Sequence, residues 1–320
     1  MDDENPTQCQ WAPPGQYPRK IPIVLIHDGG GTTFAYHILG ELNRDVYVVH
    51  NPNYWTGEPW AEGMDAQACH YIQLIKKAGI SGNILLGGWS LGGFLSVTMA
   101  RMIAADRSEP RLHVKGMVII DSPFHTPLKD LSVETAKPEL SHLPELVRKS
   151  LHNCGALLAD WSLPEWDADA YKDRGIRTVV DSTSADVDVP AGQVWYKPLK
   201  GPAEVVPVSR ASPPPAKADP DASHDVPPFS VLLRCVDRAP STDPDSTKPA
   251  HIDIRRDQLV LGWDENYPEF IKAVIDVDAH HYNLFEFERI DAQTDKINLA
   301  LKIVDNLRPL DGNESTSDSL

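Results

Sequence analysis

The sequence predicts an α/β protein built on a mostly parallel sheet with helices on both of its faces. Short, nearly continuous apolar runs, which suit strands buried on both faces, lie at residues 21–26, 45–50, 84–86, 114–120, 229–236 and 270–277. Amphipathic helical patterns separate the first four of these runs, and another follows the last. Strands that alternate with helices in this way form parallel sheets.

The alternation stops after residue 123, which predicts an insertion over residues 124–227. Apolar residues cluster at helical spacing over 140–166, so we expect the first part of the insertion to be a helical lid. The proline-rich stretch 200–225 is expected to be a flexible loop. The chain is then one domain over 21–310, with a flexible N-terminus at 1–20 and an acidic, disordered tail at 311–320.

Composition excludes several functional classes. The 320 residues carry a formal net charge of −16, and no run of Lys or Arg reverses this locally, so neither nucleic acid nor an anionic membrane is an expected partner. The four cysteines are widely scattered with no CxxC pair, which predicts no metal site and no disulfide framework. Without a signal-peptide pattern or a membrane-length apolar run, we expect a cytoplasmic protein.

The segment Gly88-Trp89-Ser90-Leu91-Gly92 fits the pattern G-x-S-x-G between an expected strand and an expected helix. This pattern is typical of a nucleophilic serine on a tight turn, where glycines are needed because side chains would collide with neighbouring elements. The alternative is a glycine-rich turn with a capping serine. The flanking strand and helix favour Ser90 as a nucleophile.

A nucleophilic serine needs a base, and the base needs an orienting acid. Asp121 directly follows the run 114–120, and His280 and His281 follow the run 270–277. Because the carboxyl ends of parallel strands meet at one edge of the sheet, these side chains are expected near Ser90. Asp257 and Asp264, which follow the run 229–236, are alternative acids, but Asp121 ends a cleaner apolar strand.

An oxyanion hole requires two aligned N–H groups. The amide of Leu91 is one candidate, and Gly29 or Gly30, in the loop after the first run, supplies the second. His27, which precedes these glycines, is expected to anchor the loop. A phosphate-binding loop is the weaker interpretation, because the spacing G-x-G-x-x-G is missing.

Five segments carry a resemblance to a known family: residues 26–31, 87–93, 118–122, 232–235 and 278–285. Together they resemble the thioesterase domains of polyketide synthases and nonribosomal peptide synthetases, particularly fungal ones. The resemblance covers most of 21–308 and is thin over 125–227. It implies an α/β-hydrolase fold with a helical lid inserted after the sixth strand. It also implies that Asp121 is the acid, and that His281, which precedes the aromatic Tyr282, is the base.

The resemblance implies a serine thioesterase that releases a polyketide or peptidyl chain from a phosphopantetheine carrier protein. Release would pass through an acyl-Ser intermediate and end in hydrolysis or cyclisation, without a bound cofactor. The expected substrate contacts are Trp89, Trp161 and Trp166, with packing inside the lid as the alternative for the last two. Two other functions stay open: a carboxylesterase or lipase-like enzyme acting on oxygen esters, and a non-catalytic binding protein with this fold.

Overall fold

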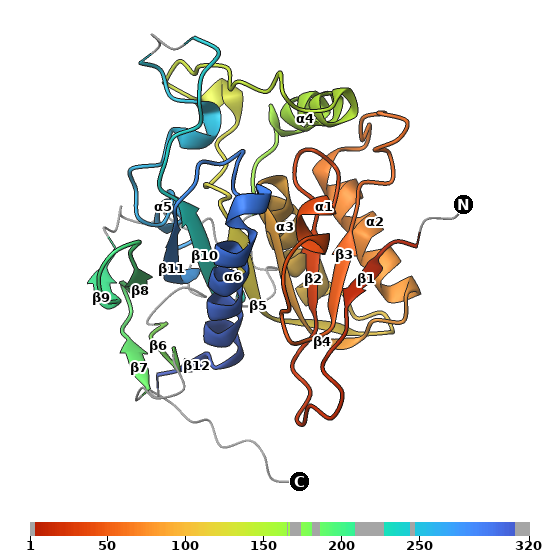
Figure 1. Cartoon of the computed structure of the whole chain (residues 1–320). Coiled ribbons are helices and arrows are strands. Elements are labelled where there is room, and N and C mark those ends of the chain that lie inside the picture. The colour runs from red at the N-terminus through yellow and green to blue at the C-terminus, as the bar shows by residue number, and fades with distance from the viewer. Residues whose placement is uncertain are drawn as a thin grey trace.

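A nine-stranded sheet forms the centre of the molecule (Figure 1). The computed structural model describes residues 4–164, 166, 174–180, 186–208, 227–243 and 247–310. Six parallel strands at the middle of the sheet lie in the order β3, β2, β4, β5, β10 and β11. Their bounds are Val46–Val49, Ile23–Ile26, Gly82–Trp89, Leu112–Ile120, Ser230–Cys235 and Ile271–Val277. Each corresponds to one of the apolar runs, so the predicted parallel sheet is confirmed.

Helices cover both faces of the sheet (Figure 1). The helices α2 (Gly63–Lys77) and α3 (Leu91–Ala105) share one core cluster with Val24 and Ile26 of β2. The helix α6 (Ile290–Asp305) and the short α1 (Phe34–His37) belong to the opposite cluster, with Ile23 and Leu25. Because successive side chains of a strand point to opposite faces, one apolar run supplies both cores.

The N-terminal segment contributes a strand, so the prediction of a flexible N-terminus was wrong for residues 7–10. Strand β1 (Thr7–Gln10) pairs antiparallel with β3 at the edge of the sheet. Amide side chains fasten it: Gln8 donates to the Asp45 carboxylate at 2.9 Å, and Gln10 donates to the Gly40 carbonyl at 2.9 Å. Residues 1–3 lie outside the described residues.

The insertion after β5 begins with a 3-10 turn, η1 (Leu128–Asp130), and one helix, α4 (Glu145–Leu158). The helix agrees with the expected helical first part. It lies at the carboxyl end of the parallel strands, above α1 and α3 (Figure 1).

Where the structure describes the insertion between residues 176 and 208, it contains strands, so the prediction of a lid and loop throughout 124–227 was wrong for those residues. Strands β8 (Gln193–Lys197) and β9 (Glu204–Pro207) form a hairpin that joins β11 and extends the central sheet. Strands β6 (Ile176–Thr178), β7 (Val187–Val189) and β12 (Arg308–Pro309) form a small second sheet. The remainder of the predicted loop, 209–225, and the predicted tail, 311–320, lie outside the described residues.

Two 3-10 turns and one short helix are the remaining elements described in the carboxyl-terminal half. The 3-10 turn η3 (His251–Asp253) and the helix α5 (Trp263–Asn266) lie between β10 and β11, and η4 (Phe287–Arg289) precedes α6. Within the described ranges, no helix is long and apolar enough to cross a membrane. The same part of the chain contains no cluster of three or more His, Cys, Asp or Glu side chains suited to a metal ion.

Candidate active site

Ser90 occupies a sharp turn between β4 and α3. Its φ of 57° lies in the left-handed region, which is strained for a residue with a side chain. The flanking glycines are sterically required: a Cβ on Gly92 would lie 2.3 Å from the Ile26 carbonyl oxygen, and one on Gly88 would lie 2.7 Å from the same atom. The close packing of this turn against β2 therefore explains the glycines of G-x-S-x-G.

His281 brings Ser90 and Asp121 into one hydrogen-bonded chain. Its Nε2 lies 2.9 Å from Ser90 Oγ, and its Nδ1 lies 2.8 Å from Asp121 Oδ2. The imidazole is nearly fully buried, and the Trp89 ring packs against it with 5.6 Å between ring centroids. The three predicted side chains thus meet at the carboxyl edge of the sheet, following β4, β5 and β11.

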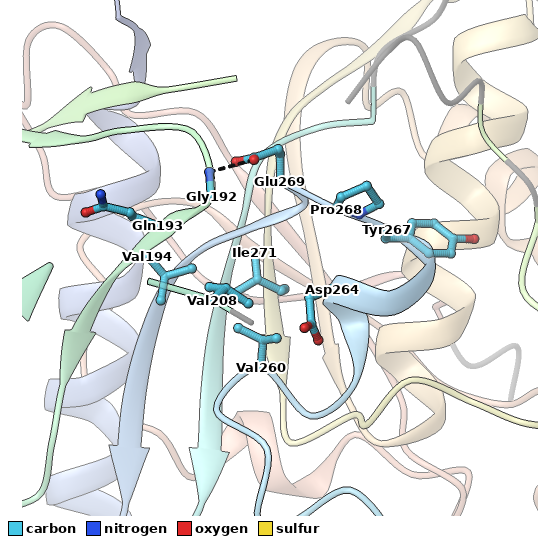
Figure 2. A pocket seen from close by; sticks show the side chains of 10 residues that line it. All are labelled: Gly192, Gln193, Val194, Val208, Val260, Asp264, Tyr267, Pro268, Glu269 and Ile271. Carbon is cyan, nitrogen blue, oxygen red and sulfur yellow. Dashed lines mark hydrogen bonds between the residues drawn. The ribbon is translucent and has the colours of Figure 1, made fainter. Parts of the chain in front are cut away.

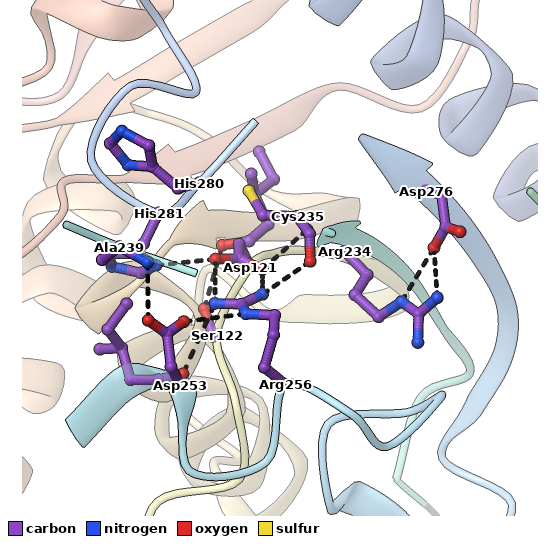
Figure 3. A network of polar contacts seen from close by, with 12 residues as sticks. Asp121, Ser122, Arg234, Cys235, Ala239, Asp253, Arg256, Asp276, His280 and His281 are labelled. Atoms are coloured by element: carbon purple, nitrogen blue, oxygen red, sulfur yellow. Dashed lines mark hydrogen bonds and ion pairs between the residues drawn. The ribbon is translucent and has the colours of Figure 1, made fainter. Parts of the chain in front are cut away.

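Asp121 is fully buried and fully hydrogen-bonded (Figure 3). The Cys235 N–H donates to Oδ1 at 2.9 Å, and the Arg256 guanidinium contacts both carboxylate oxygens. Burial alone would raise the pKa of Asp121, but the charge of Arg256 and the hydrogen bonds from His281 and Arg256 outweigh it and hold that pKa well below its usual range. Asp121 is therefore an ionised carboxylate that accepts the Nδ1–H of His281.

Arg256 and Asp253 are site residues that the sequence analysis missed. They come from the segment between β10 and β11, more than 130 residues after Asp121, where no periodicity or motif marks them. Arg256 Nε donates to Asp253 Oδ1 at 2.9 Å, and the second Asp253 oxygen accepts the Ala239 N–H at 2.7 Å. Both side chains are almost completely buried.

The alternative acids and the second histidine lie elsewhere. Asp257 is exposed and pairs with Arg238. Asp264 borders a small cavity between β8, β11 and α5, none of whose lining residues belongs to the hydrogen-bonded chain of Ser90 (Figure 2). The Nδ1 of His280 accepts the Tyr282 N–H at 3.2 Å, so this ring takes part in its own turn.

The loop of Gly29, Gly30 and Gly31 is held by His27, as expected. The His27 ring contacts the Tyr71 hydroxyl through Nε2 and the Asp28 carbonyl through Nδ1, both at 2.6 Å. Burial lowers the pKa of His27 to about 4, so the ring is neutral at physiological pH. A buried neutral histidine with both nitrogens occupied serves as an anchor for the loop.

Asp28, in the same loop, was not singled out from the sequence, although its place at the end of β2 is a signal that could have found it. The residue is partly buried, and burial raises the pKa of its carboxyl to about 7. Hydrogen bonds from the backbone of Gly30, Asp28 and Gly31 offset part of this effect. The loop therefore holds a carboxyl group that titrates near neutral pH.

Helix α4 packs directly on this glycine loop. A Cβ on Gly29 would lie 3.1 Å from both Cys154 Sγ and Leu151 Cδ2, and one on Gly30 would lie 3.2 Å from Val147 Cγ1. These three side chains are spaced four and three residues apart, so they share one face of the helix. The Asn153 side chain also donates to the Gly57 carbonyl at 3.1 Å, which ties the helix to the loop after β3.

Two of the predicted substrate-contacting tryptophans take part in packing. Trp161 stacks on His125, with 5.7 Å between ring centroids, and lies 6.2 Å from Phe94. Contact of Trp161 with the substrate stays a prediction. Trp166 borders a cavity at the far end of α3 and the start of β5, and its contact with the substrate also stays a prediction. The Arg101 guanidinium lies 5.6 Å from the centroid of the Trp166 ring. Arg101 comes eleven residues after Ser90 on α3, which at 1.5 Å per helical residue is about 16 Å along the helix.

Comparison with known proteins agrees with this fold. Residues 23–287 match the alpha/beta hydrolase family. The chain is 41% identical over 309 residues to the probable thioesterase KK1J of Curvularia clavata, which covers 96% of this chain and 98% of that protein. It is 39% identical over 315 residues to the probable thioesterase lcsE of Purpureocillium lilacinum, with coverage of 96% and 98%.

A solved structure shows the same fold. It is the NocB thioesterase domain in covalent complex with a fluorophosphonate nocardicin G analogue, with a TM-score of 0.51 and 21% identity. The match covers 88% of this chain and 94% of that domain. The predicted fold and family are confirmed: the chain belongs to the alpha/beta hydrolase family and, within it, to a group of fungal thioesterases.

Proposed function

We propose that this protein is a serine thioesterase that releases an acyl chain from the phosphopantetheine arm of a carrier protein. The observation that carries the proposal is the continuous hydrogen-bonded chain from Ser90 Oγ through His281 to Asp121. A serine on a strained turn, a base within reach and a buried acid behind the base are the parts that nucleophilic acyl transfer needs.

In the first half of the reaction, Ser90 Oγ attacks the thioester carbonyl carbon while His281 Nε2 takes the hydroxyl proton. Asp121 accepts the Nδ1–H of His281 and stabilises the imidazolium that forms. The tetrahedral intermediate collapses, the carbon–sulfur bond breaks, and the thiol leaves with the proton returned by His281. The chain is then held as an ester on Ser90.

In the second half, the attacking group is water or a nucleophile on the chain itself. His281 takes its proton, the new oxyanion forms, and the bond to Ser90 Oγ breaks as the serine recovers its hydrogen. Hydrolysis gives a free acid, and attack from within the chain gives a ring. Both outcomes use the same three residues.

The oxyanion in both halves is assigned to the N–H groups of Leu91 and Gly29. Leu91 is the first residue of α3, where N–H groups have no partner inside the helix and the helix dipole favours negative charge. Of the two predicted glycines, Gly29 is favoured because the Gly30 N–H already donates to the Asp28 carboxyl. The Gly31 N–H is also occupied, since it donates to the Asp28 carbonyl at 3.0 Å.

We assign α4 the role of a lid and place the acyl chain on the side of the site that this helix borders. The helix presents Val147, Leu151 and Cys154 to the glycine loop, and these side chains form an apolar wall beside the proposed oxyanion position. Trp89, packed on His281, borders the same site. An apolar wall of this kind suits the hydrocarbon portion of a carrier-bound chain.

Replacement of Ser90 by Ala tests the proposal. We expect turnover of an acyl-pantetheine thioester to fall by at least about 10³-fold, with the exposed Ser141→Ala as matched control. Near-normal cleavage by Ser90→Ala would overturn the assignment. The same assay with the matching oxygen ester separates a thioesterase from a carboxylesterase, which would prefer that ester. Mass spectrometry of the products distinguishes hydrolysis from cyclisation.

A further inference from the structure

We propose that Arg256 and Asp253 are positioning residues that set the orientation and the net charge of the group behind His281. Arg256 lies between two carboxylates, Asp121 and Asp253, in a cluster closed to solvent (Figure 3). The inference rests on the proposed function, because it takes His281 as the base of the reaction.

Orientation follows from the hydrogen bonds of the guanidinium. Its two terminal nitrogens contact one oxygen each of Asp121, in a bidentate arrangement that holds the plane of the carboxylate. The remaining donors reach Asp253 Oδ1 at 2.9 Å, the Cys235 carbonyl at 2.9 Å and the Ile252 carbonyl at 3.5 Å. All five N–H groups of Arg256 are thereby used. The guanidinium therefore has no freedom to turn, and Asp121 Oδ2 is fixed toward His281.

Charge balance explains the presence of Asp253. Arg256 alone would cancel the charge of Asp121, and a neutral pair would stabilise an imidazolium less than a free carboxylate does. Asp253 adds a second buried negative charge on the far side of the guanidinium. The three groups together carry one net negative charge, which preserves the attraction for the proton on His281.

The two residues therefore have opposite electrostatic effects. Asp253→Asn removes a negative charge and keeps the side-chain shape, so the imidazolium becomes less stable. Arg256→Gln removes the positive charge, so the imidazolium becomes more stable. Asp253→Asn combined with Arg256→Gln restores one net negative charge and should bring the imidazolium back toward its original stability.

The experiment measures the titration midpoint of the His281 imidazole by NMR and the acid limb of kcat/KM for an acyl-pantetheine thioester. We expect both to move down by about one pH unit in Asp253→Asn and up by a similar amount in Arg256→Gln. In the double variant we expect both to lie close to the wild type. The pH-independent rate of Asp253→Asn should fall about tenfold.

Other titratable or charged groups around this part of the site are Asp28, Cys154, Cys235, Asp237, His280, Tyr282, Glu286 and Arg289. They are the same in every variant and cancel in the comparison. Asp28 needs a separate control because its own pKa of about 7 falls in the same range. Repeating the series in an Asp28→Asn background removes its contribution to the acid limb.

Asp276→Asn is the matched control for loss of a buried ion pair. Asp276 pairs with Arg234 at 2.7 Å on the neighbouring strands and has no contact with Asp121 among the described interactions (Figure 3). It should leave the acid limb in place. If Arg256→Gln does not fold, two other variants test the inference. Asp253→Asn should shift the acid limb of kcat/KM to lower pH. Arg256→Lys, which keeps the positive charge, should lower kcat without shifting the acid limb.

Equal midpoints in the wild type and Asp253→Asn would overturn the inference, even in an active enzyme. If the midpoints shift as expected while no variant, nor the wild type, cleaves a thioester, the charge balance stands and the proposed function fails. The NMR titration thus separates the two results.

Discussion

His281 Nε2 lies 2.9 Å from Ser90 Oγ, whereas the adjacent His280 has its Nδ1 occupied by the Tyr282 N–H. The two histidines follow the same strand, β11, and differ by one position. The turn after the strand directs only one of them to the serine. This difference makes the pair a built-in control for the role of the base.

His281→Ala should lower kcat/KM for an acyl thioester by about 10³-fold or more, because Ser90 loses the group that takes its proton. His280→Ala should change it by less than about fivefold. Circular dichroism of both variants checks that they are folded. Comparable losses in the two variants would contradict the assignment of His281.

Much of the fold and the site could be predicted because short segments of the sequence indicate the strands and the turn that holds the serine. The strands buried on both faces appear as apolar runs, and the elbow at Ser90 appears as glycines around a serine. Asp121 and His281 each end such a run, and the topology of a parallel sheet brings strand ends together. The cleaner apolar strand before it favoured Asp121 over Asp264, and the family resemblance supported that choice. The choice of His281 over His280 came from the resemblance.

The rest depends on contacts that leave no local pattern. Strand β1 is held by glutamine side chains rather than by alternating apolar residues, and the hairpin of β8 and β9 is short and lies at the sheet edge. Arg256 reaches Asp121 from a turn-rich segment 135 residues later. Trp166 was predicted to contact the substrate because it lies within the segment expected to form the lid, and periodicity alone does not say which way its ring points. Long-range pairing of polar groups cannot be derived from periodicity.

Gly92→Ala should damage both stability and activity, because its Cβ would lie 2.3 Å from the Ile26 carbonyl oxygen and the backbone must move. We expect a loss of about 3 kcal/mol or more in the free energy of unfolding, measured by urea denaturation. Displacement of Ser90 by about 1 Å would lower kcat by about 100-fold. Gly155→Ala on α4 is the matched control, since its Cβ would meet no atom within 4 Å. It should stabilise the protein by about 0.5–1 kcal/mol. A Gly92→Ala variant as stable and active as the wild type would contradict the packing described for the elbow.

Asp28 should make stability depend on pH in the neutral range. Burial raises its pKa from 3.8 to about 7, so the folded protein binds this proton more tightly than the unfolded chain does. The stabilisation from the protonated carboxyl is fully present below pH 3.8, falls as pH rises, and is lost above about pH 7. Asp28→Asn keeps an acceptor for the backbone N–H groups but cannot ionise. Its melting temperature relative to the wild type should therefore rise by at least about 2 °C between pH 5 and pH 8, as measured by differential scanning calorimetry. Asp257→Asn, at an exposed aspartate, is the control and should show no such rise. A constant difference between Asp28→Asn and the wild type across this range would mean that Asp28 is already ionised at pH 5 in the folded protein.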